Sequence, residues 1–141
     1  MMKKISIAIP AYEMKGYGNQ YLKELFLSIQ KQTYKNIEVI VSDHSKNNDI
    51  LELCSSYSND LPITYVRNFY DYGNGPANTN VAIQHCTGDI IKVMFSDDLF
   101  TDSFSLEKIR QRFVDTDASW VVTGFSHTRD GKNFYRPMIP R

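Results

Sequence analysis

The sequence has few cysteines, no net charge and no long apolar run. Cys54 and Cys86 show neither the C-x-x-C spacing nor the histidine neighbours of zinc and redox sites, which predicts two reduced thiols. Sixteen basic residues balance sixteen acidic ones, so the chain lacks a positive surface that would collect nucleic acid. The apolar start at residues 5–9 stops at Pro10, far short of the roughly 20 residues of a membrane span. These absences favour a globular, cytoplasmic protein without a nucleic-acid partner.

Two common motifs are missing as well. The loop before Ala77 is rich in glycine, but it lacks the G-x-G-x-x-G spacing and does not follow the first strand, which argues against a dinucleotide-binding fold. No serine lies in a G-x-S-x-G elbow, and the three histidines are scattered, so nucleophilic serine chemistry has no support.

Hydrophobic periodicity predicts strands that alternate with helices. Runs of β-branched and apolar residues predict strands at residues 5–9, 37–41, 63–66, 90–95 and 119–125. Apolar residues at helical spacing predict helices near residues 22–29, 47–57, 77–85 and 103–113, with an irregular tail at 136–141. This order predicts an α/β fold in a single domain over residues 1–141, with a mostly parallel sheet and helices on both faces.

Ligands of parallel sheets bind where the strands end, so the residues that follow each strand are the candidates for a site. They form four groups: Pro10 to Glu13, Ser42 with Asp43, the loop around Gly75, and Ser96 with Asp97 and Asp98. We expect these four groups to meet along one edge of the sheet.

The acidic residues of these groups suggest metal and nucleotide chemistry. Two adjacent carboxylates repel each other, and a hard cation such as Mg²⁺ or Mn²⁺ bridging phosphates would stabilise Asp97 and Asp98. The alternative is that one of them caps a turn before the next helix. Asp43 could accept a hydrogen bond from a base or ribose, or it could form an Asx-turn or a helix cap.

Several stretches resemble one family over nearly the whole chain. Residues 28–43, SIQKQTYKNIEVIVSD, resemble the pattern S-[IVL]-x-x-Q-[ST]-[YF]-x-[ND]-x-E-[IV]-[IV]-[IV]-x-D of the large inverting family of GT-A glycosyltransferases, which is typified by bacterial polysaccharide and O-antigen transferases. Residues 5–13 resemble its opening strand, with Glu13 in place of the usual asparagine. Residues 75–82 resemble its G-x-x-x-A-x-N region loosely, and residues 87–92 resemble the entry to its acidic strand.

The resemblance implies roles for particular residues. Pro10, Tyr12 and Asp43 would hold the base and ribose, and Gly75 would lie near the nucleotide. Asp97 and Asp98 would form the DxD-type motif, with Asp98 as the ligand of Mn²⁺ or Mg²⁺. The commoner Asp-x-Asp-Asp form is incomplete here, because Phe95 and Ser96 precede the pair. The expected nucleotide-sugar site is completed by Ala11, Glu13, Ser96 and Asp97.

The resemblance also implies a function. A UDP-linked sugar would be the donor, and its sugar would pass with inversion to a carbohydrate or lipid-linked acceptor. The protein would associate with a membrane only through this acceptor. The general base would fall beyond Arg141, so we expect the fold to end after the metal-binding half and its open edge to favour self-association. The alternative is a nucleotide-sugar-binding module without turnover. A nucleotidyltransferase is disfavoured, because Pro10 to Glu13 is neither glycine-rich nor basic.

Overall fold

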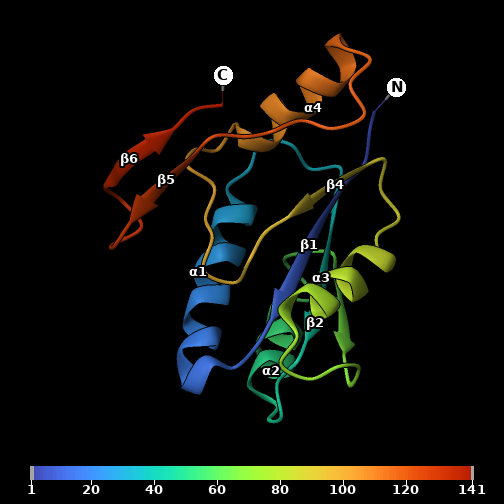
Figure 1. The fold of residues 1–141 in the computed structure, drawn as a ribbon, viewed down its shortest axis with the longest axis vertical. Coiled ribbons are helices and arrows are strands. Elements are labelled where there is room, and N and C mark those ends of the chain that lie inside the picture. Colours follow the sequence, from blue (N-terminus) through green and yellow to red (C-terminus); the bar gives the residue numbers. More distant parts are fainter. Residues whose placement is uncertain (1, 141) are drawn as a thin grey trace.

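A parallel four-stranded sheet lies at the centre of the computed structural model, which describes residues 2–140 (Figure 1). The strands lie in the order β3-β2-β1-β4. Their bounds are Ile5–Ala11 for β1, Ile37–Asp43 for β2, Ile63–Arg67 for β3 and Ile90–Val93 for β4. Each neighbouring pair is parallel, as the alternation of strands and helices predicted.

Within residues 2–140, four α-helices flank these strands. They are α1 (Tyr17–Gln30), α2 (Asp49–Ser56), α3 (Gly75–Gln84) and α4 (Ser105–Asp115), with a short 3-10 helix, η1 (Met14–Gly16), before α1. Figure 1 shows α1 and α3 on opposite sides of the strands, which confirms the prediction of helices on both faces. Within residues 2–140, no helix combines the length and the apolar character needed to cross a membrane.

The two faces of the sheet differ in character. Ile5, Ile7 and Ile9 of β1 pack in one apolar cluster with residues of α1, α2 and α4. Ser6 and Ala8, which alternate with them, are equally buried and point to the other face, where α3 packs on β1 and β2. Every residue of β1 is buried because both faces are covered, which explains why Ser6 is its one polar residue.

Residues 32–34, Gln-Thr-Tyr, belong to the stretch 28–43 that resembles the family, and they have a structural role. Gln32 is buried and joins the end of α1 to the start of α4, because its Nε2 donates to the Asp102 carbonyl at 2.7 Å and its Oε1 accepts from the Leu106 amide at 3.0 Å. The Tyr34 hydroxyl donates to the Lys3 carbonyl. Asp102 also accepts the Phe104 amide, so it closes the turn before α4 without being its N-cap residue.

Three sequence-based predictions need correction. Residues 119–124 form no strand; β5 is Phe125–Thr128, and it pairs antiparallel with β6, Phe134–Met138, in a separate two-stranded sheet. Part of the predicted irregular tail therefore lies in β6, while Arg141 falls outside the described residues. The cause is the turn at Asp130, whose carboxylate accepts the backbone amides of Lys132 and Asn133 at 2.9 and 2.8 Å and closes a hairpin. The predicted β4 strand also ends two residues early, at Val93.

Candidate functional site at the carboxyl edge of the sheet

The strand order creates a switch point between β1 and β4. The crossovers from β1 to β2 and on to β3 move in one direction, whereas β4 lies on the other side of β1. In open α/β sheets, ligands bind in the crevice beyond such a point. Pro10 near the end of β1 and Ser96 just after β4 flank it, and the buried Ser96 Oγ donates to the Pro10 carbonyl at 3.2 Å. Two of the predicted groups are therefore in contact.

The segment after β1 is shaped by a close approach of α1. The Glu13 carbonyl accepts the amides of Gly16 and Gly18 at 2.9 and 3.0 Å. A Cβ at Gly18 would lie 2.0 Å from the Tyr12 carbonyl oxygen, so only glycine fits there. Tyr12 itself is 49% exposed at the sheet edge, directly after the buried Ala11.

Asp43, the last residue of β2, is fully buried at 0% exposure. Its Oδ1 accepts the Ser45 amide at 2.8 Å, which is the Asx-turn considered as the alternative, and its Oδ2 accepts the Tyr65 hydroxyl at 2.5 Å. Arg67 Nε lies 4.0 Å from the same Oδ2. Both oxygens therefore have partners within the chain, and direct contact of Asp43 with a ligand stays a prediction.

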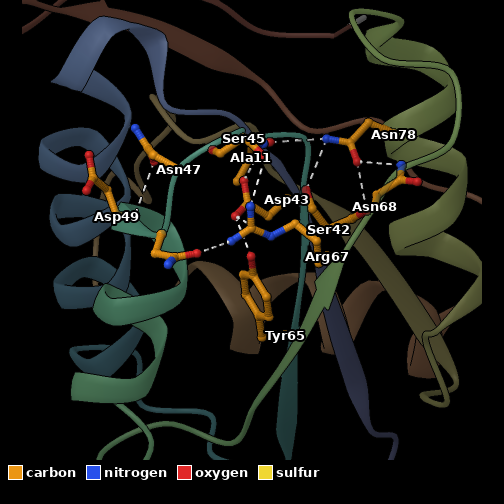
Figure 2. A network of polar contacts seen from close by, with 11 residues as sticks. Ala11, Ser42, Asp43, Ser45, Asn47, Asp49, Tyr65, Arg67, Asn68 and Asn78 are labelled. Atoms are coloured by element: carbon orange, nitrogen blue, oxygen red, sulfur yellow. Dashed lines mark hydrogen bonds and ion pairs between the residues drawn. The ribbon is translucent and has the colours of Figure 1, made fainter.

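Tyr65 and Arg67, two residues apart on β3, hold this carboxylate. Burial raises the pKa of Tyr65 above its usual value, and the hydrogen bond to Asp43 raises it further. The hydroxyl therefore stays protonated and donates. Figure 2 shows the Arg67 guanidinium reaching over Asp43 to the next loop, where it donates to the Ser45 carbonyl and to Asn48 Oδ1, both at 2.9 Å. Neither residue was predicted from the sequence, because the hydrogen-bond partners of each lie about 20 residues away along the chain.

A buried amide network joins α3 to the strand ends (Figure 2). Asn78 Nδ2 donates to the carbonyls of Ala11 and Ser42, at 3.3 and 3.0 Å, while Asn78 Oδ1 accepts from Ser42 Oγ and Asn68 Nδ2, at 2.7 and 3.0 Å. These four bonds use both polar atoms of the Asn78 carboxamide. They hold α3, which begins in the predicted loop around Gly75, against the ends of β1 and β2. The predicted helix 77–85 begins earlier, at Gly75, with Asn74 Oδ1 accepting the Ala77 amide at 3.0 Å. A Cβ at Gly75 would meet no atom within 4 Å, so its surroundings are open.

The acidic pair lies in a tight turn after β4. Asp98 Oδ2 accepts the Phe95 amide at 2.9 Å, so this carboxylate caps the turn with one of its oxygens. Asp97 is exposed, and within residues 2–140 no hydrogen bond or ion pair involves its carboxylate. Both residues line an open groove of about 1100 Å³ that runs between α4 and the β5–β6 hairpin. Lys92 lines it too; burial lowers its pKa, and the charge of Asp98 acts in the opposite direction.

Three buried side-chain oxygens lack a hydrogen-bond partner within the described part of the chain: Glu13 Oε2, Asn19 Oδ1 and Ser45 Oγ. Glu13 and Asn19 lie after β1, around the start of α1, and Ser45 follows β2. Leaving a buried polar group unpaired costs about 1–3 kcal/mol. These three oxygens lie at the same edge of the sheet as the predicted residues.

The fold has the GT-A-like architecture of known glycosyltransferases. The structure of TarS residues 1–349 from S. aureus in complex with UDP-GlcNAc matches with a TM-score of 0.67 and 26% identity, over 81% of this chain and 31% of that one. The mannosyltransferase PcManGT from Pyrobaculum calidifontis, in complex with GDP-Man and Mn²⁺, matches with a TM-score of 0.62 and 22% identity, over 75% of this chain and 31% of that one.

The family follows from the sequence comparison. Residues 6–141 match the family described as Glycosyl transferase family 2, and the chain belongs to this family. Its relatives are bacterial glycosyltransferases; GlyG of Streptococcus pneumoniae serotype 4 is 27% identical over 136 residues, which make up 96% of this chain and 44% of GlyG. The chain thus spans less than half the length of this relative.

Proposed function

We propose that this domain binds a nucleotide-diphosphate sugar at the carboxyl edge of its sheet and serves as the donor-binding part of an inverting glycosyltransferase. The observation that carries the proposal is the convergence of the segments after β1, β2 and β4, which Ser96, Asn78 and Ser42 tie together at the switch point. The family supports sugar transfer, and TarS, with its UDP-GlcNAc complex, supports a uridine nucleotide.

The proposed ligand would lie across the strand ends. The base would lie near Tyr12 and the end of β2. Asp43 holds the backbone there, because it accepts the Ser45 amide. The diphosphate would extend towards β4 and the acidic pair, with Gly75 and Glu13 near the nucleotide. This direction matches the strand order, since β2 and β4 lie on either side of β1.

The donor set fits a divalent cation. Within residues 2–140 no three His, Cys, Asp or Glu side chains gather into a complete protein cage. Nucleotide sites need no such cage, because Mg²⁺ is typically held by one or two carboxylates together with phosphate oxygens and water. Asp97 and the second oxygen of Asp98 supply such a pair, and PcManGT carries Mn²⁺. A bound Mn²⁺ or Mg²⁺ would neutralise the leaving diphosphate.

Calorimetric titration with UDP tests the proposal. We expect UDP to bind more tightly in Mn²⁺ than in EDTA, because the diphosphate and the carboxylates otherwise repel each other in one cleft. Asp98→Asn should abolish this difference. Asp60→Asn, in an exposed turn at the opposite edge, is the matched control and should keep it. Absence of UDP binding would contradict the donor site, and equal affinity in EDTA would contradict the metal.

A further inference from the structure

The β5–β6 hairpin exposes an apolar and aromatic face. Figure 1 shows the hairpin at the margin of the fold, away from β2 and β3. Phe125 pairs with Met138 and His127 pairs with Tyr135, so the members of each pair lie on the same face of the hairpin. The centroid of the His127 ring lies 5.9 Å from that of Phe125 and 5.9 Å from that of Tyr135. Phe125 and Met138 are 58% and 57% exposed, so packing within residues 2–140 leaves this face uncovered.

The same hairpin carries three cations. The Arg129 guanidinium lies over the Tyr135 ring, 5.9 Å from its centroid, and so continues the row of rings. Arg129 and Arg136 line a hollow of about 490 Å³ on the hairpin. In the described part of the chain, residues 2–140, no hydrogen bond or ion pair involves the side chains of Arg129, Lys132 or Arg136. Their charges are therefore available to an anionic partner.

The one acidic residue of this segment is engaged in the hairpin turn. Asp130 is the only Asp or Glu between positions 118 and 140. Its carboxylate accepts the amides of Asn133 and Lys132, and Asn133 Nδ2 donates to it at 2.7 Å. Residues 118–140 hold three basic residues and one acidic residue, which leaves 13 basic and 15 acidic residues in the rest of the chain. The hairpin segment is thus positive, whereas the remainder of the chain is negative.

Charge and apolar exposure together indicate the partner. Cations beside exposed aromatic side chains suit the interface of a bilayer with anionic headgroups, where rings lie at headgroup level and cations attract phosphate. A second copy of the chain fits less well, because a two-fold interface would bring Arg129, Lys132 and Arg136 towards the same residues of the other copy. A nucleic acid also fits less well, since it offers no aliphatic surface to Met138 or to Ile139, which is 81% exposed.

We propose that the β5–β6 hairpin docks on a lipid bilayer that carries anionic headgroups. Phe125, Tyr135 and Met138 enter the headgroup region, and Arg129 and Arg136 bind lipid phosphates. We expected contact with a membrane only through an acceptor, whereas the hairpin offers a direct contact that needs neither acceptor nor nucleotide.

Docking of the hairpin would also orient the candidate site. The groove that Asp97 and Asp98 line is bordered by the same hairpin. A bilayer bound to the hairpin would therefore lie close to the acidic pair. The proposal stands without the proposed function, since it depends only on the surface of the hairpin.

Co-sedimentation with lipid vesicles tests the proposal. The wild type should bind vesicles of phosphatidylcholine with added phosphatidylglycerol more tightly than pure phosphatidylcholine vesicles, and added NaCl should weaken this binding. Arg129→Gln with Arg136→Gln should weaken it about 30-fold, because each cation close to an anionic surface contributes about fivefold. Arg129→Lys with Arg136→Lys should stay close to the wild type, because lysine keeps the charge. Lys23→Gln with Lys31→Gln removes two exposed charges on and after α1 and is the matched control, which should also match the wild type.

The apolar face has a test of its own. Phe125→Ser should weaken binding to the anionic vesicles but not to dextran sulfate, a soluble polyanion that has no apolar interior. An equal loss for both ligands, or no loss for the vesicles, would overturn the assignment to lipid. Dimers that form without vesicles and that Phe125→Ser dissociates would show instead that the face joins two copies of the chain.

Two further results would overturn the proposal: no preference of the wild type for anionic vesicles, and an equal loss of binding in the arginine variant and the lysine control. Circular dichroism and melting temperature identify a variant that has lost its fold, and Phe125→Ser then decides. UDP calorimetry on the arginine variant should give the wild-type affinity, so failure of the lipid proposal is distinguishable from failure of the donor site.

Discussion

The Tyr65 hydroxyl donates a 2.5 Å hydrogen bond to Oδ2 of Asp43, 22 residues away in the sequence. This bond makes the acidic residue at the end of β2 part of the fold as well as part of the candidate site. Removing the hydroxyl in Tyr65→Phe leaves a buried carboxylate oxygen with one donor fewer, which should lower the free energy of unfolding by about 1–3 kcal/mol. Urea unfolding measures this. Tyr57→Phe, whose hydroxyl makes no hydrogen bond within residues 2–140, should change little, and an equal loss in both variants would contradict the role of the bond.

Asp43→Ala should reduce both stability and nucleotide affinity. The substitution leaves the Ser45 amide, the Tyr65 hydroxyl and the Arg67 guanidinium without their carboxylate. Breaking a buried ion pair by removing one partner typically costs about 3–5 kcal/mol, and the upper part of that range is not expected here because Arg67 keeps two other bonds. Thermal unfolding and UDP calorimetry on the same sample measure the two effects. An unchanged melting temperature would show that Asp43 is not the structural anchor described above.

Gly18 should tolerate no side chain. Its missing Cβ would lie 2.0 Å from the Tyr12 carbonyl, so Gly18→Ala must push α1 away from the end of β1 and should cost at least about 2 kcal/mol of stability. Gly75→Ala is the matched control: it is also a glycine in the first turn of a helix, but it has open space around it, and its stability should stay the same or rise slightly. Equal losses in the two variants would show that the close approach at Gly18 is not limiting.

Glu38 should make stability depend on pH in acid. Burial alone would raise the pKa of Glu38, but the hydrogen bonds from Ser6, Thr87 and Lys4 outweigh it and lower the pKa to about 2 from the usual 4.5. A carboxyl with a lowered pKa in the folded state stabilises the fold above pH 4.5, and this contribution is lost as the pH falls from 4.5 towards 2.

The measurement is the difference between wild type and Glu38→Gln in free energy of unfolding. It should be about 1–3 kcal/mol at pH 7 and should shrink between pH 4.5 and pH 3, because the carboxyl of the unfolded wild type takes up a proton there while that of the folded protein stays ionised. Glu24→Gln, exposed on α1, should show no such trend. A difference that stays constant with pH would contradict the lowered pKa.

The sequence predicted the centre of the sheet because β1 and most of β2 are buried on both faces. Such strands are mostly apolar, as at Ile5 to Ile9. The helical spacing of Leu22, Leu25, Phe26 and Ile29 likewise predicted that all four lie in the core. The same criterion failed at residues 119–125, where Trp120 and Val122 are apolar but exposed. The better signal there was Asp130-Gly131, a dipeptide typical of hairpin turns.

The candidate site was predictable only in part. Strand ends located the groups around Tyr12, Asp43 and Asp98, because parallel strands end at a common edge. Tyr65 and Arg67 lie on the same face of β3, and their partner Asp43 lies on another strand, so no local spacing reveals them. Asn78 lies within a stretch resembling the family, but its four hydrogen bonds depend on three segments meeting in space.

A chemical-shift titration of the ¹⁵N-labelled protein with UDP and Mg²⁺ tests the central claim most directly, since it locates the ligand without requiring turnover. The largest amide shifts should fall at the carboxyl edge of the sheet, at residues 11–13, 43–45 and 96–98. Residues 3–5, 36–37 and 87–89 form the opposite edge of the same sheet and should not respond. Shifts concentrated at that opposite edge, or on the β5–β6 hairpin alone, would contradict the account.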